Sequence, residues 1–300
     1  MRKSAVGKSV VITGANGGIG LATAVELAGR GFDVIGTVRS EHGAETVADA
    51  AERAGVSVRT VLCDVTDEEQ TQAAFEEIAA TTDGGPWALV NNAGIAQAGA
   101  IEDVSEELAR RQVDVNLLAP ARLMRLALPA MRARGEGRIV NVSSMSGRVA
   151  LPFLGWYAAS KYGLEAISDA ARREVAGFGV KVILIEPGSY GTGVWNTAFS
   201  ALPEREKSAY QEAYAMVDQI EAGVADMPPP TPVAQTIRRA LSSARPRSRY
   251  LVGTDAIGAV LLNSLAPTAV SDYAMRLGTG LTKAPKPFDK IVDRVVQQFV

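Results

Sequence analysis

Short apolar runs alternate with longer amphipathic segments along the first two thirds of the chain. Most of the short runs are continuously apolar, which is typical of strands covered by helices on both faces. The longer segments carry apolar residues every three or four positions, as a helix with one buried face does. Strands are expected over residues 9–13, 33–38, 57–62, 87–91, 138–142 and 180–186, and helices include 21–30, 68–80 and 121–133. The pattern predicts an α/β fold with a doubly wound parallel sheet flanked by helices.

The pattern changes after Gly188. Residues 195–226 have the spacing of a polar amphipathic helix, which the prolines of "MPPPTP" (227–232) are expected to end. A further helix is expected over 233–244, and "RYLVG" (249–253) supplies a seventh strand.

The last fifty residues are expected to be helical, with breaks at Pro267 and around 283–288. No repeat, low-complexity segment or linker divides the chain. The organisation predicted is one domain over residues 1–300, with residues 255–300 as a C-terminal helical extension.

Composition narrows the chemistry. The apolar fraction of 47% and charged fraction of 21% are ordinary for a soluble globular protein. A formal net charge of −2 gives no reason to expect nucleic acid or an anionic membrane as a partner. The single cysteine, Cys63, and the single histidine, His42, exclude Cys–His nucleophiles, Ser–His–Asp hydrolysis and His-ligated metals. No metal site is expected.

No export signal is visible at the N-terminus, where the apolar run is interrupted by Thr13 and Gly14. The apolar stretch 256–265 is too short for a bilayer, which needs about 20 residues. We therefore expect no membrane span and a cytoplasmic location.

Glycines crowd the junction between the first strand and the first helix, in "TGANGGIG". Gly14 permits a tight turn, Gly18 lets the backbone approach a phosphate, and Gly20 lets the helix pack on the strand. The helix N-terminus then offers free N–H groups and a positive dipole to a pyrophosphate. The junction predicts a dinucleotide site.

The Gly-x-x-x-Gly-x-Gly spacing, together with "NNAG" (91–94) and "YAASK" (157–161), resembles the short-chain dehydrogenase/reductase family over residues 8–192. The resemblance implies an NAD(P)(H)-binding Rossmann fold and a catalytic group of Asn116, Ser144, Tyr157 and Lys161. The positions that it implies for the cofactor are Gly14, Asn16, Gly18, Ile19 and Gly20 at the pyrophosphate, Asp64 and Val65 at the adenine, Asn91, Ala93 and Gly94 in the crevice, and Tyr157, Lys161, Pro187, Gly188 and Thr192 at the nicotinamide end.

The end of the second strand bears on the choice between NAD and NADP. A carboxylate there binds the 2′-hydroxyl of NAD, whereas a guanidinium suits the 2′-phosphate of NADP. Val38 holds the position of the NAD-type acid, and Arg39 follows it. Glu41 is a nearby carboxylate that favours NAD, and position 17, often basic in NADP-preferring relatives, is Gly17. We expect NADP(H) to be preferred over NAD(H), with Arg39 as the clamp.

Tyr157 and Lys161 are four residues apart, so a helix places both on one face. A free tyrosine has a pKa of about 10, and a neighbouring ammonium is expected to lower the pKa of Tyr157 into a useful range. Tyr157 is then the acid in carbonyl reduction and the base in alcohol oxidation, while Ser144 bonds the substrate oxygen. The resemblance implies that Lys161 also holds the nicotinamide ribose and that Asn116 seats a proton-returning water.

Residues 190–228 match the family's variable substrate lid. The residues expected to line an apolar pocket are Tyr190, Val194, Trp195, Phe199 and Leu202, with Leu151, Phe153 and Leu154 beside them. The prediction is a hydrophobic alcohol, ketone or aldehyde as substrate. The C-terminal "RYLVGTDA" is similar to members that handle steroids and retinoids. Relatives are commonly dimers or tetramers, and the oligomeric state is left open.

Three other readings stay open. The first is an NAD-dependent alcohol or steroid dehydrogenase. The second is a non-catalytic dinucleotide-sensing protein, against which the presence of Tyr157 and Lys161 argues. The third is an isomerase or lyase on nucleotide sugars, whose Gly-x-x-Gly-x-x-Gly spacing Gly14, Gly17 and Gly20 also satisfy.

Overall fold

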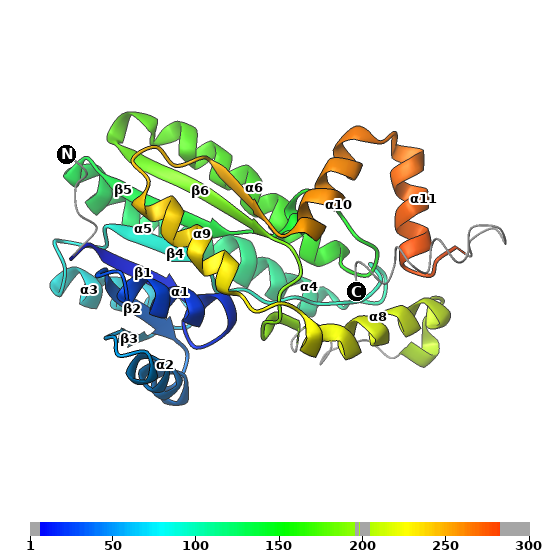
Figure 1. Ribbon diagram of the computed structural model, residues 1–300, viewed down its shortest axis with the longest axis horizontal. Coiled ribbons are helices and arrows are strands. Elements are labelled where there is room, and N and C mark those ends of the chain that lie inside the picture. Colours follow the sequence, from blue (N-terminus) through cyan, green and yellow to red (C-terminus); the bar gives the residue numbers. More distant parts are fainter. Residues whose placement is uncertain (1–6, 196–197, 199–204, 283–300) are drawn as a thin grey trace.

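The computed structural model describes residues 7–195, 198 and 205–282 of the chain. Seven parallel strands form one sheet in the order β3-β2-β1-β4-β5-β6-β7 (Figure 1). The strands are β1 (Ser9–Thr13), β2 (Asp33–Val38), β3 (Arg59–Leu62), β4 (Ala88–Asn91), β5 (Gly137–Val142), β6 (Val180–Pro187) and β7 (Arg249–Val252). The predicted doubly wound parallel sheet is confirmed, including the seventh strand.

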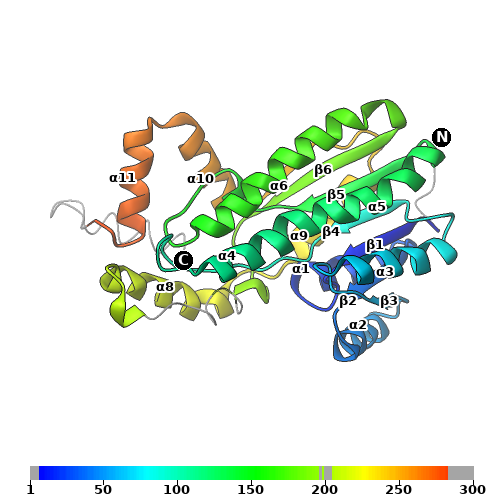
Figure 2. The same cartoon turned by 180° about the vertical axis from the view of Figure 1, so that it is seen from behind.

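Helices cover both faces of this sheet. The α-helices are α1 (Gly18–Ala28), α2 (Glu41–Arg53), α3 (Glu68–Ala80), α4 (Glu106–Val113), α5 (Ala119–Arg134), α6 (Gly155–Glu174), α8 (Gln211–Gly223), α9 (Thr231–Ser242), α10 (Thr254–Leu265) and α11 (Thr268–Gly278). Shorter helical turns are η1 (Asp114–Leu118), η2 (Met145–Gly147), η3 (Ala176–Phe178), η4 (Arg205–Lys207) and η5 (Val224–Asp226). Helices α1 and α9 lie on one face, and α3, α5 and α6 on the other (Figures 1 and 2).

Strand β1 shows why the apolar runs are continuous. Val10 and Ile12 belong to the core under α1 and α9, whereas Val11 between them packs under α3 and α5. All three side chains are fully buried, because successive residues of a strand point to opposite faces and both faces are covered.

The sheet has a switch point between β1 and β4. The chain runs outward from β1 to β2 and β3, then returns to place β4 on the other side of β1. The carboxyl ends of these two strands are joined by Thr13, whose Oγ1 accepts hydrogen bonds from the N–H groups of Asn92 (3.0 Å) and Ala93 (2.9 Å). Open α/β sheets bind ligands in the crevice at such a point.

The prediction of one helix over 195–226 is wrong for the described part of that range. Residues 195 and 198 are helical, and after the undescribed residues the structure has the turn η4, a break in the helix at 208–210, helix α8 and the turn η5. Ser208 causes the break, because its hydroxyl donates to Asp103 Oδ2 (2.7 Å) and accepts from the N–H of Tyr210 (3.0 Å). Helix α8 therefore starts only at Gln211.

Helices α10 and α11 form a hairpin beyond the carboxyl ends of the strands, coloured orange in Figure 1. The predicted break at Pro267 is confirmed, since α10 ends at Leu265 and α11 begins at Thr268. The break expected around 283–288 lies outside the described residues. Within the described residues, no helix combines the length and apolar character that crossing a bilayer requires.

Candidate active site

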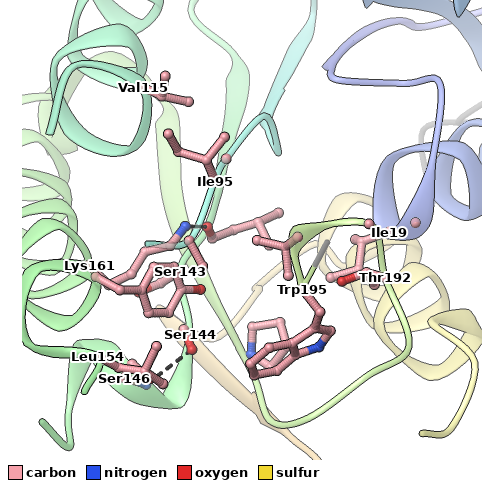
Figure 3. Close-up of a pocket in the computed structure, with 18 of the residues that line it drawn as sticks. Ile19, Ile95, Val115, Ser143, Ser144, Ser146, Leu154, Lys161, Thr192 and Trp195 are labelled. Carbon is pink, nitrogen blue, oxygen red and sulfur yellow. Dashed lines mark hydrogen bonds between the residues drawn. The ribbon is translucent and has the colours of Figure 1, made fainter. Parts of the chain in front are cut away.

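A cavity of about 1260 Å³ opens at the carboxyl ends of the strands. The glycine turn after β1 lines one end, residues after β5 and on α6 line the middle, and α10 and α11 line the far end. In Figure 3, Ile19 and Thr192 lie on one side, with Lys161 and Ser144 opposite and Trp195 between them. The predicted site residues in the lining are Gly14, Asn16, Gly18, Ile19, Arg39, Asp64, Val65, Ala93, Gly94, Ser144, Tyr157, Lys161, Pro187, Gly188 and Thr192.

The glycine turn has no room for side chains at two positions. A Cβ on Gly14, whose φ is +65°, would lie 3.1 Å from Ala93 Cα. A Cβ on Gly20 would lie 2.2 Å from the carbonyl oxygen of Gly14 and 2.6 Å from Asn92 Nδ2. Gly20 does not line the cavity but lies behind it. Because glycine has no Cβ, helix α1 can pack against the carbonyl of Gly14.

Gly18 and Gly17 differ in a way that decides between the two glycine spacings. Gly18 has φ +50°, and a Cβ there would lie 3.0 Å from Thr192 Cβ. Gly17 has extended backbone, and a Cβ there would meet nothing within 4 Å. The constrained positions are therefore Gly14, Gly18 and Gly20, the Gly-x-x-x-Gly-x-Gly pattern.

The N-terminus of α1 suits a phosphate. Its N-cap, Gly17, supplies no side-chain cap, and the first turn carries no acidic residue. The first N–H groups of a helix have no partner within the helix, so they face the cavity as anion donors. A dinucleotide diphosphate fits this cradle.

The adenosine end holds Arg39 and Asp64. Arg39 follows β2, is exposed and lines the cavity. Glu41, the rival carboxylate, stands in the first turn of α2 and is not among the cavity residues. Asp64 Oδ1 accepts from Thr66 at both the N–H (2.9 Å) and the hydroxyl (2.7 Å), which fixes the turn after β3.

Ser144, Tyr157 and Lys161 meet in the middle of the cavity. Ser144 caps η2 directly after β5, and its Oγ accepts from the N–H of Ser146 at 3.1 Å (dashed in Figure 3). Tyr157 and Lys161 lie one turn apart on α6. The Lys161 ammonium donates to the carbonyl of Val142 at 2.9 Å and lies 5.7 Å from the Tyr157 ring centroid.

The expected lowering of the Tyr157 pKa is wrong in this structure. Burial raises the pKa of Tyr157, and its hydrogen bond with Ser144 acts against the rise. Burial also lowers the pKa of Lys161 to about 8, and its ammonium donates to the carbonyl of Val142. At neutral pH Tyr157 therefore keeps its phenolic proton. Lys161, next to it, loses its charge at a lower pH than an ordinary lysine does.

Asn116 lies behind the cavity rather than in its lining. It sits in the π-helical turn η1, where its Oδ1 accepts from Ile95 N (2.9 Å) and its Nδ2 donates to Ile95 O (2.8 Å) and Ser160 Oγ (3.0 Å). These bonds tie the segment after β4 to α6. A Cβ on Gly94 would meet both Asn116 Oδ1 (3.3 Å) and Lys161 Nζ (3.7 Å), so Asn116 flanks the catalytic group through Gly94.

Asn91 also lies outside the lining, although the motif marks it. It is buried on β4, and its Nδ2 donates to Asn141 Oδ1 on β5 at 2.8 Å. Its neighbour Asn92, which we did not single out, lines the cavity and donates from Nδ2 to the carbonyl of Thr13 at 2.9 Å. The "NNAG" motif indicates that an asparagine belongs to the site, but it does not tell which of the two faces the cavity.

Asp255, in the first turn of α10, was also missed. Its Oδ2 accepts from the N–H of Ser189 at 2.7 Å, and a Cβ on Gly188 would lie 2.2 Å from its Oδ1. The start of the C-terminal extension thus holds the segment that continues to Thr192.

The substrate side of the cavity is largely apolar. Of the expected residues, Leu151, Leu154, Tyr190, Val194 and Trp195 line it. Phe153 does not, because it packs against Tyr210 and Tyr214 beneath α8 (ring centroids 6.1 and 5.1 Å apart). Phe199 and Leu202 lie outside the described residues. Beyond the expected set, α10 and α11 contribute Ala259, Leu262, Met275 and Leu277.

Comparison with known proteins agrees with this geometry. The family model described as short chain dehydrogenase matches residues 8–202. Human 17-beta-hydroxysteroid dehydrogenase type 6 is 36% identical over 283 residues, covering 89% of this chain and 87% of that protein. The chain belongs to the short chain dehydrogenase family. It is accordingly an NAD(P)-dependent dehydrogenase.

Solved members of the short chain dehydrogenase family share the architecture. A short-chain dehydrogenase from Streptomyces avermitilis superposes with a TM-score of 0.76 at 34% identity, covering 88% of this chain and 94% of that one. A metagenomic short-chain oxidoreductase in complex with NADP has a TM-score of 0.67 at 27% identity (83% and 98% covered). A short chain dehydrogenase/reductase from Burkholderia phymatum in complex with NAD has a TM-score of 0.75 at 26% identity, covering 87% of this chain and 94% of that one.

Proposed function

We propose that this dehydrogenase uses NADP(H) to interconvert a hydrophobic secondary alcohol and its ketone, or an aldehyde and its alcohol, with Tyr157 as the acid and base. The observation that carries the proposal is the meeting of Ser144, Tyr157 and Lys161 in one cavity that continues to the glycine turn after β1. The nicotinamide supplies or accepts the hydride when it is bound. The protein provides orientation and the proton.

Each side chain has a distinct part in that chemistry. Ser144 Oγ donates a hydrogen bond to the substrate oxygen and stabilises the charge that develops there. Tyr157 gives its phenolic proton to that oxygen in reduction and takes it back in oxidation. The Lys161 ammonium stabilises the phenolate that Tyr157 becomes and donates to the ribose hydroxyls. Asn116 holds the segment after β4 against α6 and so keeps Gly94 and Lys161 in register.

The preference for NADP(H) rests on Arg39. Its guanidinium borders the cavity, and no hydrogen bond or ion pair to another described residue engages it, whereas Glu41 stands outside the lining. A free guanidinium is a strong partner for a phosphate dianion. Structural relatives hold NADP in one case and NAD in another, so the fold alone does not make the choice.

The hydrophobic substrate rests on the apolar side of the cavity between Trp195 and α11. A relative whose name gives a hydroxysteroid as its substrate favours a bulky alcohol or ketone. The dimer or tetramer and the cytoplasmic location stay predictions.

The test is NADPH oxidation followed by absorbance against a panel of ketones and aldehydes that includes steroids and short-chain diketones. Turnover of at least one apolar carbonyl supports the proposal. Tight NADPH binding without turnover of any member would favour the dinucleotide-sensing reading. Turnover of a nucleotide sugar with no net NADPH change would favour an isomerase or lyase.

The cofactor assignment has its own test in Arg39→Ala. Loss of a charge-assisted hydrogen bond is expected to weaken NADP⁺ binding about 10- to 100-fold and leave NAD⁺ binding nearly unchanged. Arg53→Ala, in the exposed last turn of α2, is the matched control. Equal weakening of both nucleotides by Arg39→Ala would show that the assignment of NADP(H) through Arg39 is wrong.

A further inference from the structure

Two buried carboxylates lie directly behind the catalytic group. Glu165 follows Lys161 by one turn of α6, so the two side chains share a face of the helix. Glu186 is on β6, one residue before Pro187. Their residues are only 6% and 1% exposed. Carboxylates are almost never buried this deeply unless they are paired, so a specific arrangement must hold them.

Arg249 of β7 supplies the pairing. Its Nε lies 3.0 Å from Glu165 Oε2 and 3.2 Å from Glu186 Oε1, and its Nη2 lies 3.0 Å from Asp169 Oδ1. Arg148 adds a longer contact, 3.5 Å from Glu186 Oε2. Asp169 is also paired with Arg172 (2.9 Å) and Arg173 (3.8 Å). The Arg249 Nε is shared between the two buried carboxylates, Glu165 and Glu186, so it does not cancel the charge of Glu165 by itself.

The Glu165 side chain is also fixed by packing. A Cβ on Gly147 in η2 would lie 2.8 Å from Ser143 Oγ, 3.0 Å from Glu165 Cγ and 3.3 Å from the carbonyl of Lys161. Burial raises the pKa of the Glu165 carboxyl, and the neighbouring Arg249 guanidinium acts against that rise. A carboxylate confined in this way acts on Lys161 from a constant position.

Lys161 needs such a neighbour. Burial lowers the pKa of Lys161 to about 8, and the negative charge of Glu165 acts in the opposite direction. The other titratable or charged groups on α6 are Tyr157, Tyr162, Asp169, Arg172, Arg173 and Glu174. Those on or next to the elements packed against α6 are Glu106, Glu107, Arg110, Arg111, Asp114, Arg148, Lys181, Glu186 and Arg249. Of the described charged groups, Glu165 is the one that raises the pKa of Lys161.

We propose that Glu165, held by Arg249, is a positioning residue that keeps the Lys161 ammonium charged beside Tyr157. Its effect on turnover rests on the proposed function. Its effect on the charge of Lys161 does not. An ammonium stabilises a phenolate, and a neutral amine does so far less. Removing the carboxylate should therefore lower the rate first at alkaline pH, where Lys161 loses its charge.

The direct test is a pH titration of the Lys161 side chain by NMR in the cofactor-free full chain, labelled with ¹³C-lysine. The Lys161 signal is identified as the one lost in Lys161→Met. Glu165→Gln removes a negative charge and keeps the shape, so the Lys161 midpoint is expected to fall by about one pH unit or more. Glu165→Asp keeps the charge, so its Lys161 midpoint should stay close to that of the wild type.

Glu174→Gln, on the exposed end of the same helix, is the matched control and should leave the midpoint unchanged. A midpoint that does not move in Glu165→Gln, or that moves equally in Glu174→Gln, overturns the inference. If Glu165→Gln does not fold, as judged by circular dichroism, Glu165→Ala removes the same charge and should shift the midpoint in the same direction.

The pH profile of kcat/KM with NADPH and a carbonyl that the wild type reduces gives the second readout. Its alkaline limb should move to lower pH in Glu165→Gln and not in Glu174→Gln. If no carbonyl is turned over, the proposed function fails while the NMR titration still decides the role of Glu165. If turnover is found and its alkaline limb does not move, the role of Glu165 fails alone.

Discussion

At the scale of single residues, the protonation of Tyr157 and Lys161 shapes the chemistry. Burial raises the pKa of Tyr157 and lowers that of Lys161 to about 8, because a buried charge of either sign loses its hydration. The phenol therefore carries its proton at neutral pH and is ready to act as an acid. This state suits carbonyl reduction near neutrality, whereas alcohol oxidation needs the phenolate and should rise with pH.

Tyr157→Phe removes only the phenolic oxygen. Loss of the acid is expected to lower kcat by roughly 10²- to 10⁴-fold, while NADPH affinity measured by fluorescence stays nearly unchanged. Tyr162→Phe, on the exposed side of the same helix, is the control and should retain activity. Comparable turnover in the two variants would rule out the acid role of Tyr157.

Lys161→Met tests the cost of a buried ammonium. The pKa of Lys161 is lower in the folded chain (about 8) than in the unfolded chain (10.5), so folding disfavours the charged form. The destabilisation is complete below about pH 8 and disappears as the pH rises from 8 to 10.5. The variant should thus be inactive yet more stable at pH 7, by on the order of 3 kcal/mol. Urea unfolding at pH 7 and pH 10 measures this, and an equal difference at both would contradict it.

At the scale of elements, the site is made where strands end and helices begin. Strand β5 ends at Val142, whose carbonyl accepts a hydrogen bond from the Lys161 ammonium. Two residues later, Ser144 caps η2. The C-terminal extension takes part as well, because Asp255 at the start of α10 holds the N–H of Ser189. The hairpin of α10 and α11 is therefore a wall of the site and not an appendage.

Met275→Trp tests that wall. Met275 on α11 borders the far end of the cavity, and a larger ring there should shorten the space left for substrate. We expect the KM of a bulky apolar ketone to rise while that of a short-chain diketone stays the same. Tyr273→Trp enlarges an exposed ring outside the lining on the same helix and serves as control. A rise for both ketones would show that α11 acts on the fold in general and not on substrate length.

At the scale of the whole molecule, the cavity draws on both halves of the sheet. The glycine turn and Arg39 come from the β1–β3 side, and the proposed catalytic residues come from η2, which follows β5, and from α6. A ligand spanning the switch point thus contacts elements that are far apart in the sequence. Binding of this kind stabilises the folded state, by about 2.7 kcal/mol at a ligand concentration of 100 times Kd.

Saturating NADP⁺ is therefore expected to raise the melting temperature in a thermal-shift assay. Gly18→Val should abolish the rise, because φ is +50° there and a Cβ would press on Thr192 at 3.0 Å. Gly17→Ala should preserve it, since that position has extended backbone and open space. Loss of the rise in Gly17→Ala alone would mean that the other glycine spacing holds the phosphates.

Much of the fold was predictable because its signals are local. The apolar runs located all seven strands, although β3 begins at Arg59 instead of residue 57. The segment 195–226 was mispredicted because the hydroxyl of Ser208 bonds Asp103, a hundred residues away in sequence, and no helical spacing reports such a contact. Phe153 was expected beside the pocket but packs elsewhere for the same reason, since its ring partners are Tyr214 on α8 and Tyr210 just before it.

The amino-acid sequence by itself determined the sheet, the glycine turn and the order of Ser144, Tyr157 and Lys161, because each depends on spacing along a few residues. Only the tertiary structure decided that Asn91 and Asn116 point away from the cavity, that Glu165 lies behind Lys161 under Arg249, and that α11 borders the substrate side. It also decided the direction of the pKa shift of Tyr157. Burial and electrostatic fields sum over neighbours from the whole chain, and no short pattern contains that sum.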